Sequence, residues 1–182
     1  MDQHKLYRTI QVLAEAPFRT EDQLVIHVME SIAKAQQIPI RGARIWKLEV
    51  STGTYRLIHQ SGEMEAIDKN FRIKVQEYPF FQQLQRKGTV IGRETNPHLV
   101  QKGIKMFSAT GVGEKIQWKQ LSLYQYVIGI TAAYVKQEMT YTLNIISNAL
   151  TSSMKNRKAE KKARELEADL DKARDIQKSI LP

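Results

Sequence analysis

The 182-residue sequence contains no cysteine. This absence excludes disulfide bonds, thiolate metal sites, thiol nucleophiles and thioether-linked chromophores, and it is typical of a cytoplasmic protein. The chain also lacks an apolar run of 18 or more residues, and its first residues, MDQHKLYRT, lack the apolar segment of a signal peptide. We therefore expect a cytoplasmic protein without a membrane partner.

Glycine and proline are missing from the last part of the chain, from Lys136 up to Pro182. The second half of this stretch consists mainly of Ala, Leu, Glu, Lys, Arg and Asp, most of which favour helix. A helix of roughly 45 residues is about 65 Å long, which exceeds the core of a small domain. The sequence therefore predicts a domain at residues 1–135 and a long helix at residues 136–182 that needs a partner.

Apolar residues recur in this helix at alternating spacings of three and four, as in a coiled coil. The a and d positions are Ala163, Leu166, Leu170, Ala173, Gln177 and Ile180. In a parallel pair, position g faces position e of the partner five residues further on, which joins Lys162 with Glu167, Asp169 with Arg174, and Ile176 with Leu181. Because all three pairings are favourable, we expect a parallel homodimer. The alternative is a single helix folded back on its own domain.

The formal net charge of +9 raises the question of nucleic-acid binding. The basic residues are spread along the chain, and the densest basic block, 155–164, is followed by an acidic block, 165–171. A charged coiled-coil face explains both blocks. Since no nucleic-acid motif accompanies them, we expect no nucleic-acid partner.

The rest of the chain mixes helical and strand periodicities. Helices are expected around residues 6–13, from a cap at Thr20 with Gln23 to about Gln37, and from Pro79 onward. Strands are expected as a hairpin at 43–60 and at 71–75, 89–95, 115–123 and 124–134. The stretch 96–114 is loop-like, with room for a short helical or strand piece around GIKMFSAT at 103–110. This order predicts an α+β fold with an antiparallel sheet flanked by helices.

The order of elements resembles that of a GAF domain, a sensory module of the same general architecture as PAS. The tail carries Ala173, Ile176, Gln177, Ile180, Leu181 and Pro182 as an A-x-x-I-Q-x-x-I-L-P string. This string looks like the linker that joins such sensors to PPM-type serine phosphatases of the SpoIIE/RsbU class. The resemblance implies that a phosphatase domain follows, that it requires Mn or Mg, and that its substrate is a phosphorylated protein, such as an antagonist of an anti-sigma factor.

The metal-binding aspartates of that phosphatase lie downstream of Pro182 in the family, so we expect this chain to be a regulatory part and not an enzyme. The tail residues Ile176, Leu181 and Pro182 are expected to dock the output domain. Within the chain, no nucleophile, base and acid form a catalytic motif, and no metal site is expected. An alternative is a free-standing ligand-binding or protein-interaction module that recruits a different partner.

Ligand binding is common in GAF domains, some of which bind cyclic nucleotides, haem or bilins. The cysteine used for bilin attachment is missing, and DKNFRIKVQE does not reproduce the signature of cyclic-nucleotide binders. Four residues, Trp46, His59, Phe71 and Trp118, would line a pocket if their strands face it, although aromatic residues in strands are also common core residues. The TGVGE segment at 110–114 could direct backbone amides toward an anion, with a plain loop as the alternative. No cofactor is therefore assigned to this chain, and its small-molecule ligand stays unknown.

Overall fold

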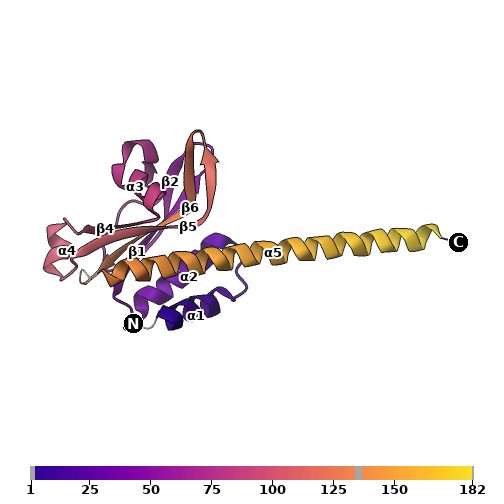
Figure 1. Ribbon diagram of the computed structural model, residues 1–182, viewed down its shortest axis with the longest axis horizontal. Coiled ribbons are helices and arrows are strands. Elements are labelled where there is room, and N and C mark those ends of the chain that lie inside the picture. Colours follow the sequence, from indigo (N-terminus) through magenta and orange to yellow (C-terminus); the bar gives the residue numbers. More distant parts are fainter. Residues whose placement is uncertain (1–2, 134–136, 182) are drawn as a thin grey trace.

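The computed structural model describes residues 3–133 and 137–181 (Figure 1). Its helices are α1 (Gln3–Ala14), α2 (Glu21–Lys34), α3 (Pro79–Lys87), α4 (Pro97–Gln101) and α5 (Glu138–Ile180), and η1 (Val75–Glu77) is a 3-10 helix. Its strands are β1 (Ile40–Glu49), β2 (Thr54–Gly62), β3 (Arg72–Lys74), β4 (Thr89–Arg93), β5 (Met106–Trp118) and β6 (Leu121–Ala132). The predicted domain boundary at 135/136 and the tail residue Pro182 lie outside the described residues.

These strands form one antiparallel sheet in the order β3-β2-β1-β6-β5-β4. Helices α1, α2 and α5 cover one face, and η1 with α3 covers the other (Figure 1). Alternate residues of β6 divide between the two sides: Tyr126 and Ile128 join the core under α1, α2 and α5, whereas Leu123 and Val127 join the core under α3. The predicted α+β fold with an antiparallel sheet is therefore confirmed.

Helix α2 begins at the predicted cap. The Oγ1 of Thr20 accepts a hydrogen bond from the backbone N–H of Gln23 at 3.2 Å, and the Gln23 side chain accepts one from the backbone N–H of Arg19 at 3.1 Å. Glu21 and Asp22 occupy the first turn, where carboxylates favour the positive end of the helix dipole. Local sequence is therefore sufficient to fix where this helix starts.

Strand β5 differs most from the prediction. The expected loop at 96–114 contains α4 and the first part of β5, and the expected strand at 115–123 is a hairpin that turns at 119–120. The pieces considered at 103–110 and expected at 115–123 overlap the two ends of β5, but the continuous strand was not predicted, because small residues weaken the β signal. Gly111 is required there, since a Cβ would lie 2.2 Å from Cδ2 of Tyr124. The close packing of β5 thus requires small residues, and the same small residues make the strand difficult to predict from the sequence.

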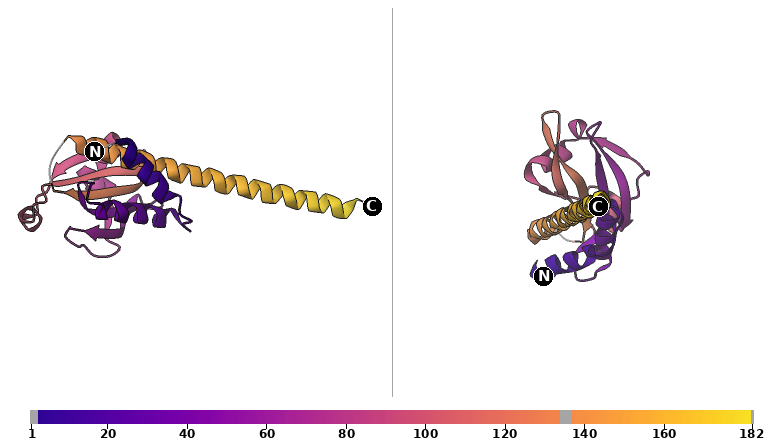
Figure 2. Two further views of the ribbon diagram at one scale, coloured as in Figure 1. Left: turned by 90° about the horizontal axis from the view of Figure 1, so that it is seen from below. Right: turned by 90° about the vertical axis from the view of Figure 1, so that its right-hand side faces the viewer.

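Helix α5 has two parts. Its first part contributes Met139, Leu143, Ile146, Leu150 and Met154 to the core, whereas every residue from Lys158 to Leu181 is exposed. The helix leaves the domain as one uninterrupted element, as all views show (Figures 1 and 2). The domain core therefore extends well into the predicted linker helix, and only the part beyond Arg157 projects. In the described part of the chain, no helix is long and apolar enough to cross a membrane.

Candidate functional site

The projecting part of α5 carries the whole predicted coiled-coil seam. Its larger apolar residues are between 55 and 74% exposed; they are Leu166, Leu170, Ile176, Ile180 and Leu181. The predicted charge-pair residues are exposed too, namely Lys162, Glu167, Asp169 and Arg174. Ala163, Ala173 and Gln177 complete this exposed seam. This placement does not match a helix folded back on its own domain.

Arg157 marks the point where α5 leaves the domain. Its Nη2 donates a hydrogen bond to the backbone carbonyl of Phe18, and its guanidinium carbon lies 5.8 Å from the centroid of the Phe18 ring. Phe18 in turn packs against His27 of α2, with ring centroids 5.3 Å apart. The sequence gives no signal for this contact, because Arg157 stands inside the basic block of the helix.

A second set of polar contacts joins α5 to β5. The backbone N–H of Gly113 donates to Oγ1 of Thr151 at 3.0 Å, and Oγ of Ser147 donates to the backbone carbonyl of Gly111 at 2.5 Å. Gly113 has a φ of 91° and lies in a bulge between Val112 and Lys115. The amide of Gly113 in the TGVGE segment is therefore bonded to α5 and not directed toward an anion.

The four candidate pocket residues do not converge. Trp46 is buried on the α3 side of the sheet. Its ring meets those of Phe71 and Phe81 edge-on, with centroid distances of 6.3 Å and 5.8 Å. His59 lies on the opposite side of the sheet, with its Nε2 3.1 Å from Oε1 of Glu30 on α2.

A register shift explains the position of His59. In the β1–β2 pairing, Ile45 faces His59, but its neighbour Trp46 faces Leu57, so β2 holds one extra residue, Ile58. Because such a bulge shifts the alternation of side chains, His59 moves to the face of Ile45. Simple alternation from Leu57 would have placed His59 beside Trp46.

Phe71 and Trp118 occupy different ends of the aromatic side. Phe71 precedes β3 and is half exposed, and its backbone carbonyl accepts a hydrogen bond from the N–H of Leu57 at 2.8 Å. Trp118 ends β5 and packs over Gly53, where a Cβ would lie 2.5 Å from Cε2 of the indole. Lys119 Nζ lies 4.7 Å from the centroid of the Trp118 ring. Both Trp46 and Trp118 therefore contribute mainly to packing.

A cavity of about 880 Å³ lies beside Trp118, between α3 and the β5–β6 hairpin. We call it the basic cavity. Its polar lining residues are Gln76, Gln82, Gln85, Arg86, Lys115, Lys119, Gln120 and Ser122. The sequence analysis did not find it, because these residues come from separate elements and form no linear motif.

One wall of the basic cavity is fixed by a buried network around Gln85. The Gln85 amide donates to Oη of Tyr55 at 3.1 Å and accepts from the backbone N–H of Tyr124 at 2.9 Å. Tyr55 Oη donates to the Tyr124 carbonyl at 2.5 Å, and burial raises the pKa of Tyr55. Lys115 Nζ donates to the backbone carbonyl of Gln85 at 2.9 Å. The wall is therefore well ordered by its own hydrogen bonds.

Metal binding has no support in this geometry: over residues 3–133 and 137–181, no three His, Asp or Glu side chains are placed to hold an ion together.

No protein-family model matches the sequence, and no curated protein matches it significantly. Solved structures do match. The GAF domain of A. aeolicus nlh2 in an inactive state is 16% identical, with a TM-score of 0.62 over 85% of this chain and 96% of that one. The GAF domain of a phosphoenolpyruvate-protein phosphotransferase from Coxiella burnetii is also 16% identical, with a TM-score of 0.58 over 88% and 96%. A phycocyanobilin-bound GAF domain from a cyanobacterial phytochrome is 12% identical, with a TM-score of 0.57 over 88% and 97%. The chain therefore has a GAF-type fold.

Proposed function

We propose that this chain is a non-catalytic sensor and dimerisation module that passes a signal along α5. The observation that carries this proposal is that one uninterrupted helix belongs to both the domain core and the exposed coiled-coil seam. Met154 is buried in the core, and Leu166 is 56% exposed on the same helix. Any repacking around the first part of α5 must therefore displace the second part, because the backbone hydrogen bonds run through both.

A parallel homodimer would cover the exposed seam. Fully burying a leucine side chain stabilises an assembly by about 1.5–3 kcal/mol, and Leu166 and Leu170 each expose more than half of their surface in the single chain. In a parallel pair, Lys162 would meet Glu167 of the partner and Asp169 would meet Arg174. Each of these exposed charge pairs would add little affinity, but together they would favour the parallel orientation.

The last residues of α5 suggest which domain receives the signal. The string from Ala173 to Leu181 resembles the linker of PPM/SpoIIE-class phosphatases, so we expect α5 to lead into a protein serine phosphatase that acts on a phosphoprotein. Mn or Mg would be bound by that domain and not by this chain. Alternatively, the exposed seam recruits a different partner to a free-standing module.

Light scattering at micromolar concentration tests the assembly. We expect twice the 21.0 kDa mass of the chain. Spin labels at Ser179, near the tip of α5, should lie close together in a parallel dimer and far apart in an antiparallel one. A monomer mass, or distant labels, would remove the proposed dimer.

The output is tested separately with the native downstream segment restored. Dephosphorylation of a phosphoserine protein in the presence of Mn, and its absence in a metal chelator, would support the phosphatase assignment. A downstream segment without metal-dependent phosphatase activity would favour the alternative partner.

A further inference from the structure

The basic cavity has a one-sided charge. Three cationic side chains line it from three elements: Arg86 from the last turn of α3, Lys115 from β5, and Lys119 from the hairpin turn. No Asp or Glu is found among its described lining residues. A concave site lined by one sign of charge focuses the electrostatic field and concentrates ions of the opposite sign. The cavity is therefore suited to an anion.

The donors in the cavity are partly positioned before any ligand arrives. Lys115 Nζ is held by the Gln85 carbonyl at 2.9 Å and lies 4.8 Å from the Tyr124 ring, which leaves two of its three N–H donors for another acceptor. Arg86 follows Gln85 directly on α3, so the buried Gln85 network also fixes the backbone from which the guanidinium extends. Such preorganisation reduces the entropy lost on binding.

The number of these donors, and their origin on three different elements, favour a phosphoryl group over a carboxylate. A carboxylate offers two oxygens in one plane, whereas a phosphoryl group offers three oxygens that can be met from several sides. Arg86 can bind two of these oxygens, and Lys115 and Lys119, which line the same cavity from β5 and from the hairpin turn, can bind the third. Gly53 and Lys119 Nζ both pack against the Trp118 ring, so part of its surface is already covered.

From this geometry we propose that the basic cavity binds a phosphorylated small molecule, with Arg86, Lys115 and Lys119 as its phosphoryl ligands. The volume of about 880 Å³ falls within the range of small-molecule sites and exceeds what a free phosphate ion needs. Residues of α3 and of the β5–β6 hairpin line the cavity. Helix α3 lies on the opposite side of the sheet from α5 (Figure 1). The proposed site does not depend on whether the projecting helix dimerises or meets a phosphatase.

Pyrophosphate is the probe for this site. The chain has two tryptophans, so its ¹H–¹⁵N spectrum has two indole N–H signals. At constant ionic strength, titration with sodium pyrophosphate should shift the Trp118 indole signal in a saturable manner. The signal of Trp46, which is 5% exposed in the aromatic core, should stay in place.

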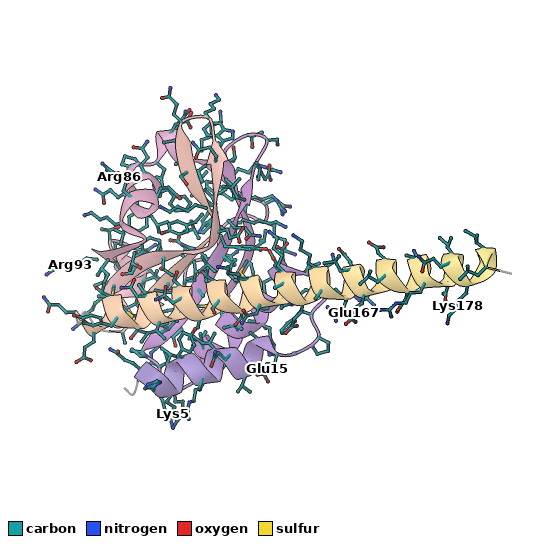
Figure 3. All side chains as sticks on the ribbon, turned by 45° about the vertical axis from the view of Figure 1, so that its right-hand side comes forward. Lys5, Glu15, Arg86, Arg93, Glu167 and Lys178 are labelled. Atoms are coloured by element: carbon teal, nitrogen blue, oxygen red, sulfur yellow. The ribbon has the colours of Figure 1, made fainter. Side chains whose placement is uncertain are left out.

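Two matched variants separate specific binding from general attraction. Arg86→Gln should weaken pyrophosphate binding about tenfold, because a charged hydrogen bond is lost. Arg93→Gln removes the same charge at an exposed position on β4 outside the cavity lining, and it should leave the affinity unchanged (Figure 3). Lys115→Gln should also weaken binding, and its circular dichroism spectrum and melting temperature report whether the fold survives.

Three results would overturn the proposal. The first is a titration to millimolar pyrophosphate in which the Trp118 signal does not move. The second is an equal loss of affinity in Arg86→Gln and Arg93→Gln, which would show attraction to the overall positive charge. The third is citrate binding as tightly as pyrophosphate, which would show that the cavity has no preference for phosphoryl groups.

Discussion

Arg157 of α5 donates a hydrogen bond to the backbone carbonyl of Phe18, and its guanidinium lies over the ring of the same residue. Phe18 belongs to the segment between α1 and α2, so this contact ties the N-terminal helices to the last half-buried residue of α5. All later residues of the helix are exposed. The contact therefore fixes the direction in which α5 leaves the domain.

The first prediction concerns this contact. Arg157→Ala leaves the Phe18 carbonyl without its donor and removes the apolar stem of the arginine, so the free energy of unfolding should fall by about 1–3 kcal/mol. Urea denaturation measures this free energy of unfolding. Lys158→Ala is the control: its Nζ lies 3.7 Å from Glu114 in an exposed ion pair, and its loss should cost less than about 0.5 kcal/mol. Equal losses in the two variants would show that Arg157 is only a surface residue.

The second prediction concerns alkaline pH. Burial, followed by the hydrogen bond to Asp22 and the negative charges of Asp22 and Glu21, raises the pKa of Tyr126 above its usual value. An unfolded tyrosine ionises near pH 10, and the folded one only at higher pH. Its contribution to stability is therefore complete below about pH 10 and is lost as the pH rises above that value.

Tyr126→Phe should accordingly reduce the slope with which the free energy of unfolding falls between about pH 9.5 and 11. Urea denaturation at a series of pH values gives this slope. Tyr141→Phe provides the baseline, because Tyr141 is 59% exposed on α5. Identical slopes in both variants would mean that Tyr126 does not govern the alkaline loss of stability.

The third prediction concerns the proposed dimer. Leu170 occupies the central a position, so Leu170→Glu would place a charge from each chain in the seam and should dissociate the dimer at micromolar concentration. Ala168→Glu adds the same charge at position f, on the outer surface of the coil, and should leave the mass doubled. A Leu170→Glu variant that stays dimeric with an unchanged melting temperature would place the interface elsewhere on the chain.

The fourth prediction concerns transmission. Ile176 and Leu181 widen the apolar surface of the tip beyond the a and d positions, and both are exposed. We expect Ile176→Ser and Leu181→Ser to leave the fold and the dimer nearly intact. In the protein with its native downstream domain, they should change the rate of phosphoprotein dephosphorylation. Unaltered rates with and without signal would show that the tip is a passive connection.

Local sequence predicted those features that depend on local chemistry. The Thr20 cap, the strand expected at 124–134 and the uninterrupted helix at the C-terminus each follow from neighbouring residues, and the structure contains the cap, the helix and, within β6, the strand. The heptad seam is present as an exposed stripe, and its pairing stays a prediction. Local features of this kind were the main basis for predicting the α+β fold class.

Features that depend on distant contacts were not predictable in the same way. The bulge at Ile58 places His59 against Glu30, yet nothing in the sequence of β2 marks an extra residue. The basic cavity unites Arg86 and Lys115, which meet only because α3 packs across the hairpin. Side-chain direction after a bulge, and proximity across elements, are tertiary properties that periodicity does not encode.

If α5 tilts as a rigid rod about Arg157, where it leaves the domain, its exposed part magnifies the movement. About 24 residues extend beyond Arg157, which gives an arm of roughly 35 Å. A tilt of about 5° at Arg157 would therefore move Leu181 by about 3 Å. Gly113, bonded to Thr151 of the same helix, stands two residues from Lys115 of the basic cavity. A displacement of a few tenths of an ångström in β5 would thus suffice, without any loss of helical structure, for a shift at the far end comparable to the diameter of a water molecule.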